Sequence, residues 1–198
     1  MEPAKKPSRP WLSLGVVLLV TLGALYLVLI GTRPARQQAM GGPEVAALPA
    51  SKPPAPAQIA PGALYAASFP GLDDKVLALG KWQGQIIVLN FWATWCVPCR
   101  EEMPIFDRVQ KKLADRGVVI IGLAADDKAK VAPFLQTSPV SYQILIGDFE
   151  ALEFARRLGS TQAALPYTVI IDRSGNIVRT KLGPYTEAEL EAQIGSAL

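Results

Sequence analysis

The chain of 198 residues contains no histidine and only two cysteines, and these shortages exclude several classes of function. Structural zinc sites take four ligands, mostly from cysteine and histidine, so this chain cannot build a usual one alone. A zinc site shared by two copies stays open as an alternative. Ser-His and Cys-His nucleophile pairs both need an imidazole base and are excluded. The two thiols are therefore interpreted as a reactive dithiol/disulfide couple.

The two cysteines lie three positions apart in NFWATWCVPCREEMP, residues 90–104. A disulfide stabilises a fold mainly by closing a long loop of the unfolded chain, and a bridge from Cys96 to Cys99 closes almost none. A c-type haem site has histidine directly after the second cysteine, where this chain has Arg100. We predict a redox-active Cys96–Cys99 disulfide that needs no metal and no cofactor.

Net positive charge is missing from most of the chain. From Ala63 onward there are 14 Lys and Arg residues against 15 Asp and Glu residues, so the positive surplus behind the net charge of +3 lies in the first 62 residues. This balance predicts no nucleic-acid partner for the folded part. The pair Asp126-Asp127 is interpreted as part of a solvated loop and not as a metal site.

A long uncharged run stands near the N-terminus. Residues 12–31 read LSLGVVLLVTLGALYLVLIG, and as a helix they would span about 30 Å, the thickness of the hydrocarbon core. We predict a single-pass anchor at 11–31 in the cell inner membrane, with residues 1–10 in the cytoplasm and the rest in the periplasm. The alternatives are a cleaved signal peptide and a buried core helix. A signal peptide would export the domain just as the anchor would.

The remainder divides into a linker and one domain. Residues 32–62 are rich in Pro and Ala and predict a tether without a core. Residues 63–198 predict an α/β fold with a central mixed sheet and helices on both faces. The strands are expected at 86–92, 118–125, 141–147, 168–172 and 177–183, and the helices from Cys96 to Gly117 and at 128–138, 149–159 and 186–198. A hairpin is expected to turn near Asp73-Asp74.

The cysteines are expected at the first turn of the helix that follows strand 86–92. Free amides and the positive end of the helix dipole favour a thiolate there. Cys96 is predicted to be exposed and nucleophilic, and Cys99 more buried and resolving. The intervening Val97-Pro98 lacks a histidine that could stabilise the thiolate further, which favours a reductant over a strong oxidant.

The stretch NFWATWCVPCREEMP, with LPYTVIIDRSGNIV downstream, resembles the membrane-anchored TlpA/ResA-like branch of the thioredoxin superfamily. The resemblance covers about residues 63–198 and implies a thioredoxin-like fold. It also implies a thiol-disulfide reductase outside the cytoplasmic membrane, whose partners are disulfide-containing client proteins and a membrane thiol electron donor. Members of this branch often serve cytochrome c maturation or metal-centre assembly.

The same resemblance assigns further site residues. Pro166 matches the cis-proline that faces the disulfide, so the Leu165 backbone would pair with an extended client segment. Glu102 matches an acidic residue that influences cysteine acidity and proton transfer, with a solvated helix carboxylate as the alternative. Asn90 stands where many thioredoxins carry a buried acid. Trp95 is expected either to contact partners and tune the site or to pack locally.

Other functions remain open at this stage. A thiol oxidase or isomerase would use the same cysteines at a different reduction potential. A non-catalytic adaptor of thioredoxin fold, whose CxxC is incidental, is a further alternative, and disulfide reduction that is unchanged by Cys96→Ser would support it. A peroxidase lacks the surrounding Thr and Arg that its peroxidatic cysteine needs, and a metallochaperone lacks histidine ligands.

Overall fold

The computed structural model describes residues 59–198. The predicted N-terminal tail, the predicted anchor at 11–31 and nearly all of the predicted linker lie outside the described residues. Within residues 59–198, no helix combines the length and the apolar character needed to cross a membrane. The anchor therefore stays a prediction from the sequence.

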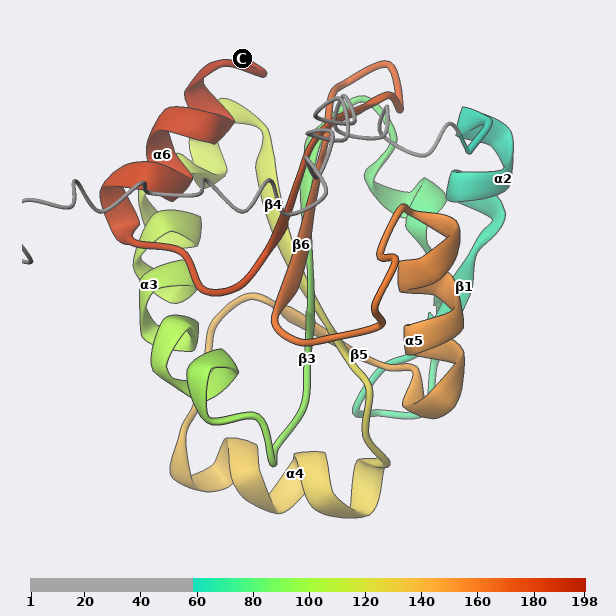
Figure 1. Ribbon diagram of the computed structural model, residues 1–198, viewed down its shortest axis with the longest axis vertical. Helices are drawn as coiled ribbons and strands as arrows, with labels where there is room; N and C mark the ends of the chain where they lie inside the picture. Colours follow the sequence, from blue (N-terminus) through green and yellow to red (C-terminus); the bar gives the residue numbers. More distant parts are fainter. Residues whose placement is uncertain (1–58) are drawn as a thin grey trace, which may run out of the picture. The chain divides into compact units, whose positions relative to one another are not determined.

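A five-stranded mixed sheet forms the centre of the fold, in the order β5-β4-β3-β6-β7 (Figure 1). β3, β4 and β5 run parallel, whereas β6 pairs antiparallel with β3, and β7 with β6. The strands span Ile86–Trp92 (β3), Val118–Ala124 (β4), Gln143–Ile146 (β5), Tyr167–Ile171 (β6) and Ile177–Leu182 (β7). An antiparallel hairpin of β1 (Ser68–Pro70) and β2 (Val76–Ala78) precedes them. The predicted mixed α/β sheet is confirmed.

Helices cover both faces of this sheet, as Figure 1 shows. α3 and α6 lie on one face, α5 lies on the other with α2 and β1, and α4 crosses the end of the sheet where β3 finishes. The helices span Pro61–Ala66 (α2), Val97–Leu113 (α3), Lys128–Thr137 (α4), Asp148–Arg157 (α5) and Glu187–Gly195 (α6), with 3-10 turns at Leu79–Trp82 (η1) and Ala114–Arg116 (η2).

β3 is buried along its whole length because it is the middle strand of a sheet covered on both faces. Successive side chains of a strand point to opposite faces. Val88 and Trp92 pack in the hydrophobic cluster that contains α3, whereas Leu89 and Phe91 pack in the cluster that contains α5. Asn90 shares the face of Val88 and Trp92, so its amide is directed toward α3.

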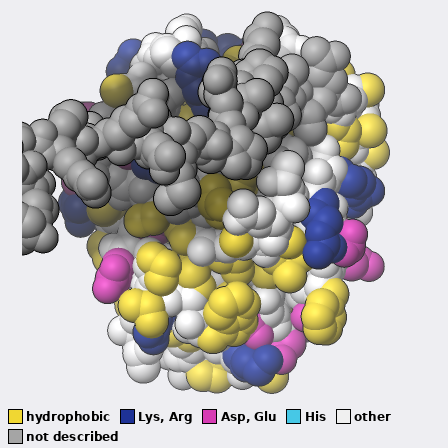
Figure 2. All heavy atoms as spheres, in the orientation of Figure 1, with side chains coloured by type: hydrophobic (Ala, Val, Ile, Leu, Met, Phe, Trp, Pro, Cys, Tyr) yellow, Lys and Arg dark blue, Asp and Glu magenta, His cyan; other side chains and the backbone are white. Residues whose placement is uncertain are grey.

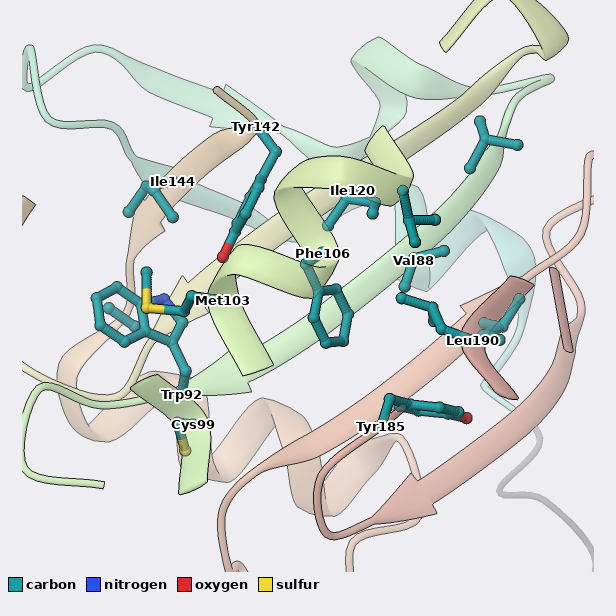
Figure 3. Packing of buried hydrophobic residues seen from close by; sticks show 14 of the residues in the cluster. Val88, Trp92, Cys99, Met103, Phe106, Ile120, Tyr142, Ile144, Tyr185 and Leu190 are labelled. Atoms are coloured by element: carbon teal, nitrogen blue, oxygen red, sulfur yellow. The ribbon is translucent and has the colours of Figure 1, made fainter. Parts of the chain in front are cut away.

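The core on the α3 face reaches the cysteines. Figure 3 shows Cys99, Met103 and Phe106 of α3 among side chains of the sheet, with Trp92 beside Met103. Spacing of three or four residues keeps these side chains on one face of the helix. The inner cysteine is therefore part of a packed core, which holds the start of α3 in place.

Two boundaries differ from those predicted. α2 begins at Pro61, inside the predicted linker, and its Leu64 is fully buried, so the described domain starts before residue 63. Proline is favourable at the first position of a helix, and a Pro- and Ala-rich sequence concealed this short one. The helix after Cys96 ends at Leu113 and not at Gly117, because a 3-10 turn intervenes before Gly117 takes up a left-handed conformation.

Candidate functional site

Both cysteines lie at the junction of β3 and α3. β3 ends at Trp92, a three-residue loop follows, and Cys96 is the N-cap residue of α3. Pro98 lies in the first turn, where a missing amide hydrogen removes no helical hydrogen bond. Cys96 and Cys99 form a disulfide with their Cα atoms 5.3 Å apart.

The start of α3 favours negative charge on the Cys96 sulfur. The backbone N–H of Cys99 donates a hydrogen bond to Sγ of Cys96 at 3.3 Å. α3 has 17 residues and no acidic side chain in its first turn, so the positive end of its dipole is uncompensated there. Both effects stabilise a thiolate relative to a thiol at this position.

The two cysteines differ in exposure, but less than predicted. Cys96 is 5% exposed and Cys99 is fully buried. The expectation of an exposed Cys96 is wrong for the disulfide form, in which its sulfur is bonded to the fully buried Cys99. The predicted order is still observed, since Cys96 keeps a small exposed fraction and Cys99 has none.

Two exposed apolar side chains stand beside Cys96. Trp95 is 64% exposed and Val97 is 50% exposed, and they flank Cys96 in the sequence. Figure 2 shows hydrophobic side chains spread over the lower part of this face, where α4 and the start of α3 lie in Figure 1. Trp92, in contrast, is a core residue. Exposed aromatic and aliphatic side chains around a reactive group suit contact with another protein.

The loop before β6 provides a second part of the site. The Leu165–Pro166 peptide bond is cis. Tyr167 is in register with Phe91, so Pro166 lies beside the end of β3, from which the chain leads directly to Cys96. Within the described part of the chain, no hydrogen bond involves the backbone N–H or C=O of Leu165. This backbone is therefore free to pair with another extended chain.

Glu102 is a buried carboxyl group on α3, one turn beyond Cys99 and on the same face of the helix. It is only 1% exposed. Its Oε1 accepts a hydrogen bond from Nδ2 of Asn90 at 2.9 Å, and its Oε2 accepts one from the backbone N–H of Tyr185 at 3.0 Å. Nδ2 of Asn90 also donates to Oγ1 of Thr168 at 3.1 Å. The alternative of a solvated helix carboxylate is wrong.

Burial sets the acidity of this group. It raises the pKa of Glu102 to about 7, against the lowering effect of the hydrogen bonds from Tyr185 and Asn90 and of the positive charge of Lys181. Burial, with the nearby charge of Glu102, also raises the pKa of Tyr142. Glu102 can therefore both accept and release a proton near neutral pH, at one turn from Cys99.

Asp126 holds the loop between β3 and α3 through a side-chain hydrogen bond. The prediction that it is a solvated loop residue is wrong. It lies two residues after β4 and is 3% exposed. Its Oδ2 accepts a hydrogen bond from Oγ1 of Thr94 at 2.5 Å, and its Oδ1 accepts one from Nζ of Lys130 at 2.9 Å. Burial acts to raise the pKa of Asp126, but these hydrogen bonds outweigh it and lower the pKa.

Replacing Thr94 with valine is expected to lower the free energy of unfolding by about 2 kcal/mol at pH 7, because a buried carboxylate loses a donor. Because the pKa of Asp126 is lower in the folded protein than its ordinary value of 3.8, the ionised carboxylate stabilises the fold at pH values above 3.8. This stabilisation is lost as the pH falls through the lowered folded-state pKa. The difference between wild type and variant should therefore narrow below about pH 4. Urea unfolding of wild type and Thr94→Val at pH 7 and at pH 3 measures this difference in the free energy of unfolding.

The exposed Thr137 offers a matched control, since its hydroxyl bonds only to the backbone oxygen of Phe134 at the end of α4. Thr137→Val is expected to change the free energy of unfolding by less than about 0.5 kcal/mol. An equal loss in Thr94→Val and Thr137→Val would contradict the role assigned to the bond between Thr94 and Asp126.

Comparison with known proteins gives agreeing results. Residues 50–194 match the Redoxin family. The chain is 32% identical over 136 residues to the thioredoxin-like protein YneN of Bacillus subtilis, covering 64% of this chain and 74% of YneN. It is 31% identical over 124 residues to the thiol-disulfide oxidoreductase ResA of Bacillus cereus, covering 62% of this chain and 69% of ResA. A crystal structure of a thioredoxin-family thiol:disulfide interchange protein from Chlorobium tepidum TLS matches with a TM-score of 0.57 and 29% identity, over 66% of this chain and 92% of that one.

Proposed function

The chain belongs to the Redoxin family and is a ResA-like thiol-disulfide oxidoreductase of the thioredoxin superfamily, and from this premise we propose that it reduces disulfide bonds in partner proteins outside the cytoplasmic membrane. The observation that carries the proposal is the Cys96–Cys99 disulfide at the start of α3. Cys96 is the more exposed of the two cysteines, and Cys99 lies one helical turn before the buried acid Glu102.

The first step uses the reduced protein. The Cys96 thiolate attacks one sulfur of a client disulfide, and the client S–S bond breaks. A mixed disulfide forms between Cys96 and the client, and the other client sulfur leaves as a thiolate that takes a proton from water. The N-terminal position on α3 supports Cys96 in this role, because it favours the charged sulfur.

The second step releases the client. The Cys99 thiol gives its proton to the Glu102 carboxylate, and the resulting thiolate attacks Sγ of Cys96. The mixed disulfide breaks, the second client sulfur leaves as a thiolate that takes a proton from water, and the two electrons lost by Cys96 and Cys99 in forming their disulfide have passed to the client. The pKa of about 7 and the spacing of one helical turn support Glu102 as the acceptor of this proton. Asn90 would hold the carboxylate in position through its amide.

The client is proposed to bind as an extended segment over the cis-proline loop. The free backbone of Leu165 beside cis-Pro166 supports pairing of the strand-addition kind. Trp95 and Val97 would contact apolar client side chains next to the cysteine. Main-chain pairing gives affinity for many sequences, so specificity would depend on surfaces beyond Leu165.

The location and partners of this activity are part of the proposal. The uncharged run at 12–31 supports a single-pass anchor in the inner membrane, with the domain on the periplasmic side. A membrane thiol protein would then return two electrons to the disulfide. The resemblance to TlpA/ResA-like proteins supports clients of the cytochrome c maturation or metal-centre assembly type.

The reduction potential tests the direction of exchange. We expect the full chain, equilibrated with thiol/disulfide buffers and followed by tryptophan fluorescence, to have a midpoint near about −270 mV, as thioredoxin-type reductants do. Trp95, adjacent to Cys96, makes fluorescence a suitable signal. A midpoint near about −120 mV would assign the protein to the oxidants and overturn the proposed direction.

A further inference from the structure

A row of polar side chains leads from the buried acid to the edge of the sheet. Asn90 of β3 is in register with Thr168 of β6, and Thr168 is in register with Lys181 of β7. Residues directly opposite each other on antiparallel strands project to the same face, which here is the face of α3 and α6. Neighbouring strands lie about 4.8 Å apart, so the Lys181 backbone lies about 10 Å from that of Asn90, whose amide donates to Glu102.

Lys181 contacts the loop that binds the acid, which joins β7 to α6 and comprises residues 183–186. Its Nζ lies 4.4 Å from the centre of the Tyr185 ring, in cation–π contact. The backbone N–H of Tyr185 donates to Oε2 of Glu102 at 3.0 Å. The Tyr185 ring also packs edge-on against Phe106 of α3, with 6.3 Å between the ring centres (Figure 3). Lys181 therefore contacts the same residue that binds Glu102.

Glu189 of α6 fixes the position of the lysine ammonium group. Nζ of Lys181 donates to both carboxylate oxygens of Glu189, at 2.5 and 2.6 Å. The Lys181 side chain is only 27% exposed. An exposed ion pair contributes little to stability, but a cation near a buried carboxyl group changes the acidity of that group. This ion pair is therefore placed to act on Glu102 as well as to join β7 to α6.

Lys181 is the cation that acts on Glu102. Burial is the main influence on the pKa of Glu102 and raises it, whereas the two hydrogen bonds that it accepts and the charge of Lys181 lower it. Burial is also the main reason that the pKa of Tyr142 is raised and that the pKa of Tyr185 is raised to about 12, so both phenols are neutral near pH 7. The titratable and charged groups near the acid, with those that act on these two tyrosines, are Cys99 and Asp107 of α3, Tyr142 before β5, Arg179 and Lys181 of β7, Tyr185, and Glu189 of α6.

We propose that Lys181, held by Glu189, is a positioning residue of the resolving step, in which it holds Tyr185 on Glu102 and supplies the positive charge that favours the carboxylate form. That form accepts the proton during release of the client. This inference rests on the proposed reductase function and adds a residue of β7, far from the cysteines in the sequence. Because Lys181 acts through Glu102, its loss should move the pH range of the resolving step and leave the first attack unchanged.

The test follows the two steps separately in the reduced full chain. Cys96 attacks one equivalent of dithiobis(nitrobenzoate), which breaks the S–S bond of the reagent, forms a mixed disulfide and releases one coloured aromatic thiolate. Cys99 then displaces the second aromatic thiolate, so stopped-flow absorbance records two phases. In wild type the rate constant of the second phase should rise with pH through about 7, as the Glu102 carboxylate forms.

Variants of the ion pair should move this midpoint in opposite directions. Lys181→Met removes the positive charge and should raise the midpoint by about 0.5 in pH, because the carboxylate loses a favourable interaction. At pH 7 the second phase should slow about twofold, whereas at about pH 9 it should match wild type. Glu189→Gln removes the negative charge beside Lys181 and should lower the midpoint by a similar amount. Lys181→Arg keeps the charge and should keep the wild-type midpoint.

Lys112→Met is the matched control, since Nζ of Lys112 also pairs with a carboxylate of α6, that of Glu191, at 2.8 Å. Lys112 lies about 15 Å along the axis of α3 from Glu102, and its loss should leave the midpoint unchanged. An unchanged midpoint in Lys181→Met, an equal shift in Lys112→Met, or shifts in the same direction in Lys181→Met and Glu189→Gln would overturn the inference. Release of only one thiolate by wild type would instead overturn the two-step exchange of the proposed function.

Discussion

Replacing Cys99 with serine is expected to stop turnover and to leave Cys96 joined to client proteins in stable mixed disulfides. Cys99 is the buried member of the pair and lies within reach of Cys96, with 5.3 Å between their Cα atoms. Without its thiolate, nothing in the site displaces the client from Cys96. Steady-state reduction of a peptide disulfide should fall by roughly a hundredfold or more. Non-reducing gels and mass spectrometry of the full chain expressed in cells would identify the trapped clients.

Cys96→Ser is the matched control for this trap. It removes the attacking sulfur, so it should abolish reduction and accumulate no mixed disulfide, although Cys99 is still present. Both variants lose the same disulfide. A difference in the amount of trapped mixed disulfide therefore reflects the different roles of the two cysteines and not a difference in stability. If Cys96→Ser trapped as much client as Cys99→Ser, the assignment of attacking and resolving sulfurs would be wrong.

Replacing Glu102 with glutamine is expected to change how stability depends on pH. Its folded-state pKa of about 7 lies above the ordinary value of 4.5, so the folded protein binds more protons than the unfolded chain between these values. The stabilising effect of the protonated group is complete below about pH 4.5 and is lost as the pH rises through about 7. The loss amounts to about 3 kcal/mol. In Glu102→Gln this part of the pH dependence should disappear, as measured by urea unfolding of the oxidised protein at pH 4.5 and pH 8.

The neighbouring Glu101 provides the control, because it is exposed on the same helix. Glu101→Gln should keep the wild-type slope between pH 4.5 and pH 8. Glu102→Gln should also slow release of the second client sulfur and remove a step near pH 7 from its rate profile, since the proton of Cys99 loses its acceptor. An unchanged slope in Glu102→Gln, or its loss in Glu101→Gln, would refute the account of the buried acid.

Continuous apolar runs made the sheet predictable. β3, β4 and β6 are buried almost throughout and read as largely apolar runs, whereas the half-exposed β7 was predicted as the hairpin partner that follows the turn at 173–176. Each strand of the central sheet begins and ends within two residues of its prediction. α2 was missed because six residues of Pro, Gly, Ala, Leu and Tyr carry no helical period of their own. Its stability depends on burying Leu64 against the domain, which a local pattern cannot reveal.

The site was predictable where its residues are neighbours in the sequence. The CxxC spacing and its helix start are local, and the resemblance pointed to Pro166 and Glu102. The partners of Glu102 were not foreseen, because the backbone of Tyr185 is 83 positions away and only the fold brings it close. Asp126 looked like half of a solvated pair, and only its contact with Thr94, 32 positions away, makes it a buried anchor of the cysteine loop.

The acidity of Cys96 in the reduced full chain tests the central claim most directly. Alkylation by iodoacetamide, measured against pH with each site identified by mass spectrometry, gives the thiol pKa and the order of reaction. We expect Cys96 to react first, with a midpoint near pH 7 and well below the value of about 8.5 for free cysteine, while Cys99 is protected. A midpoint at or above about 8.5, or alkylation of Cys99 before Cys96, would contradict a surface thiolate poised at the start of α3.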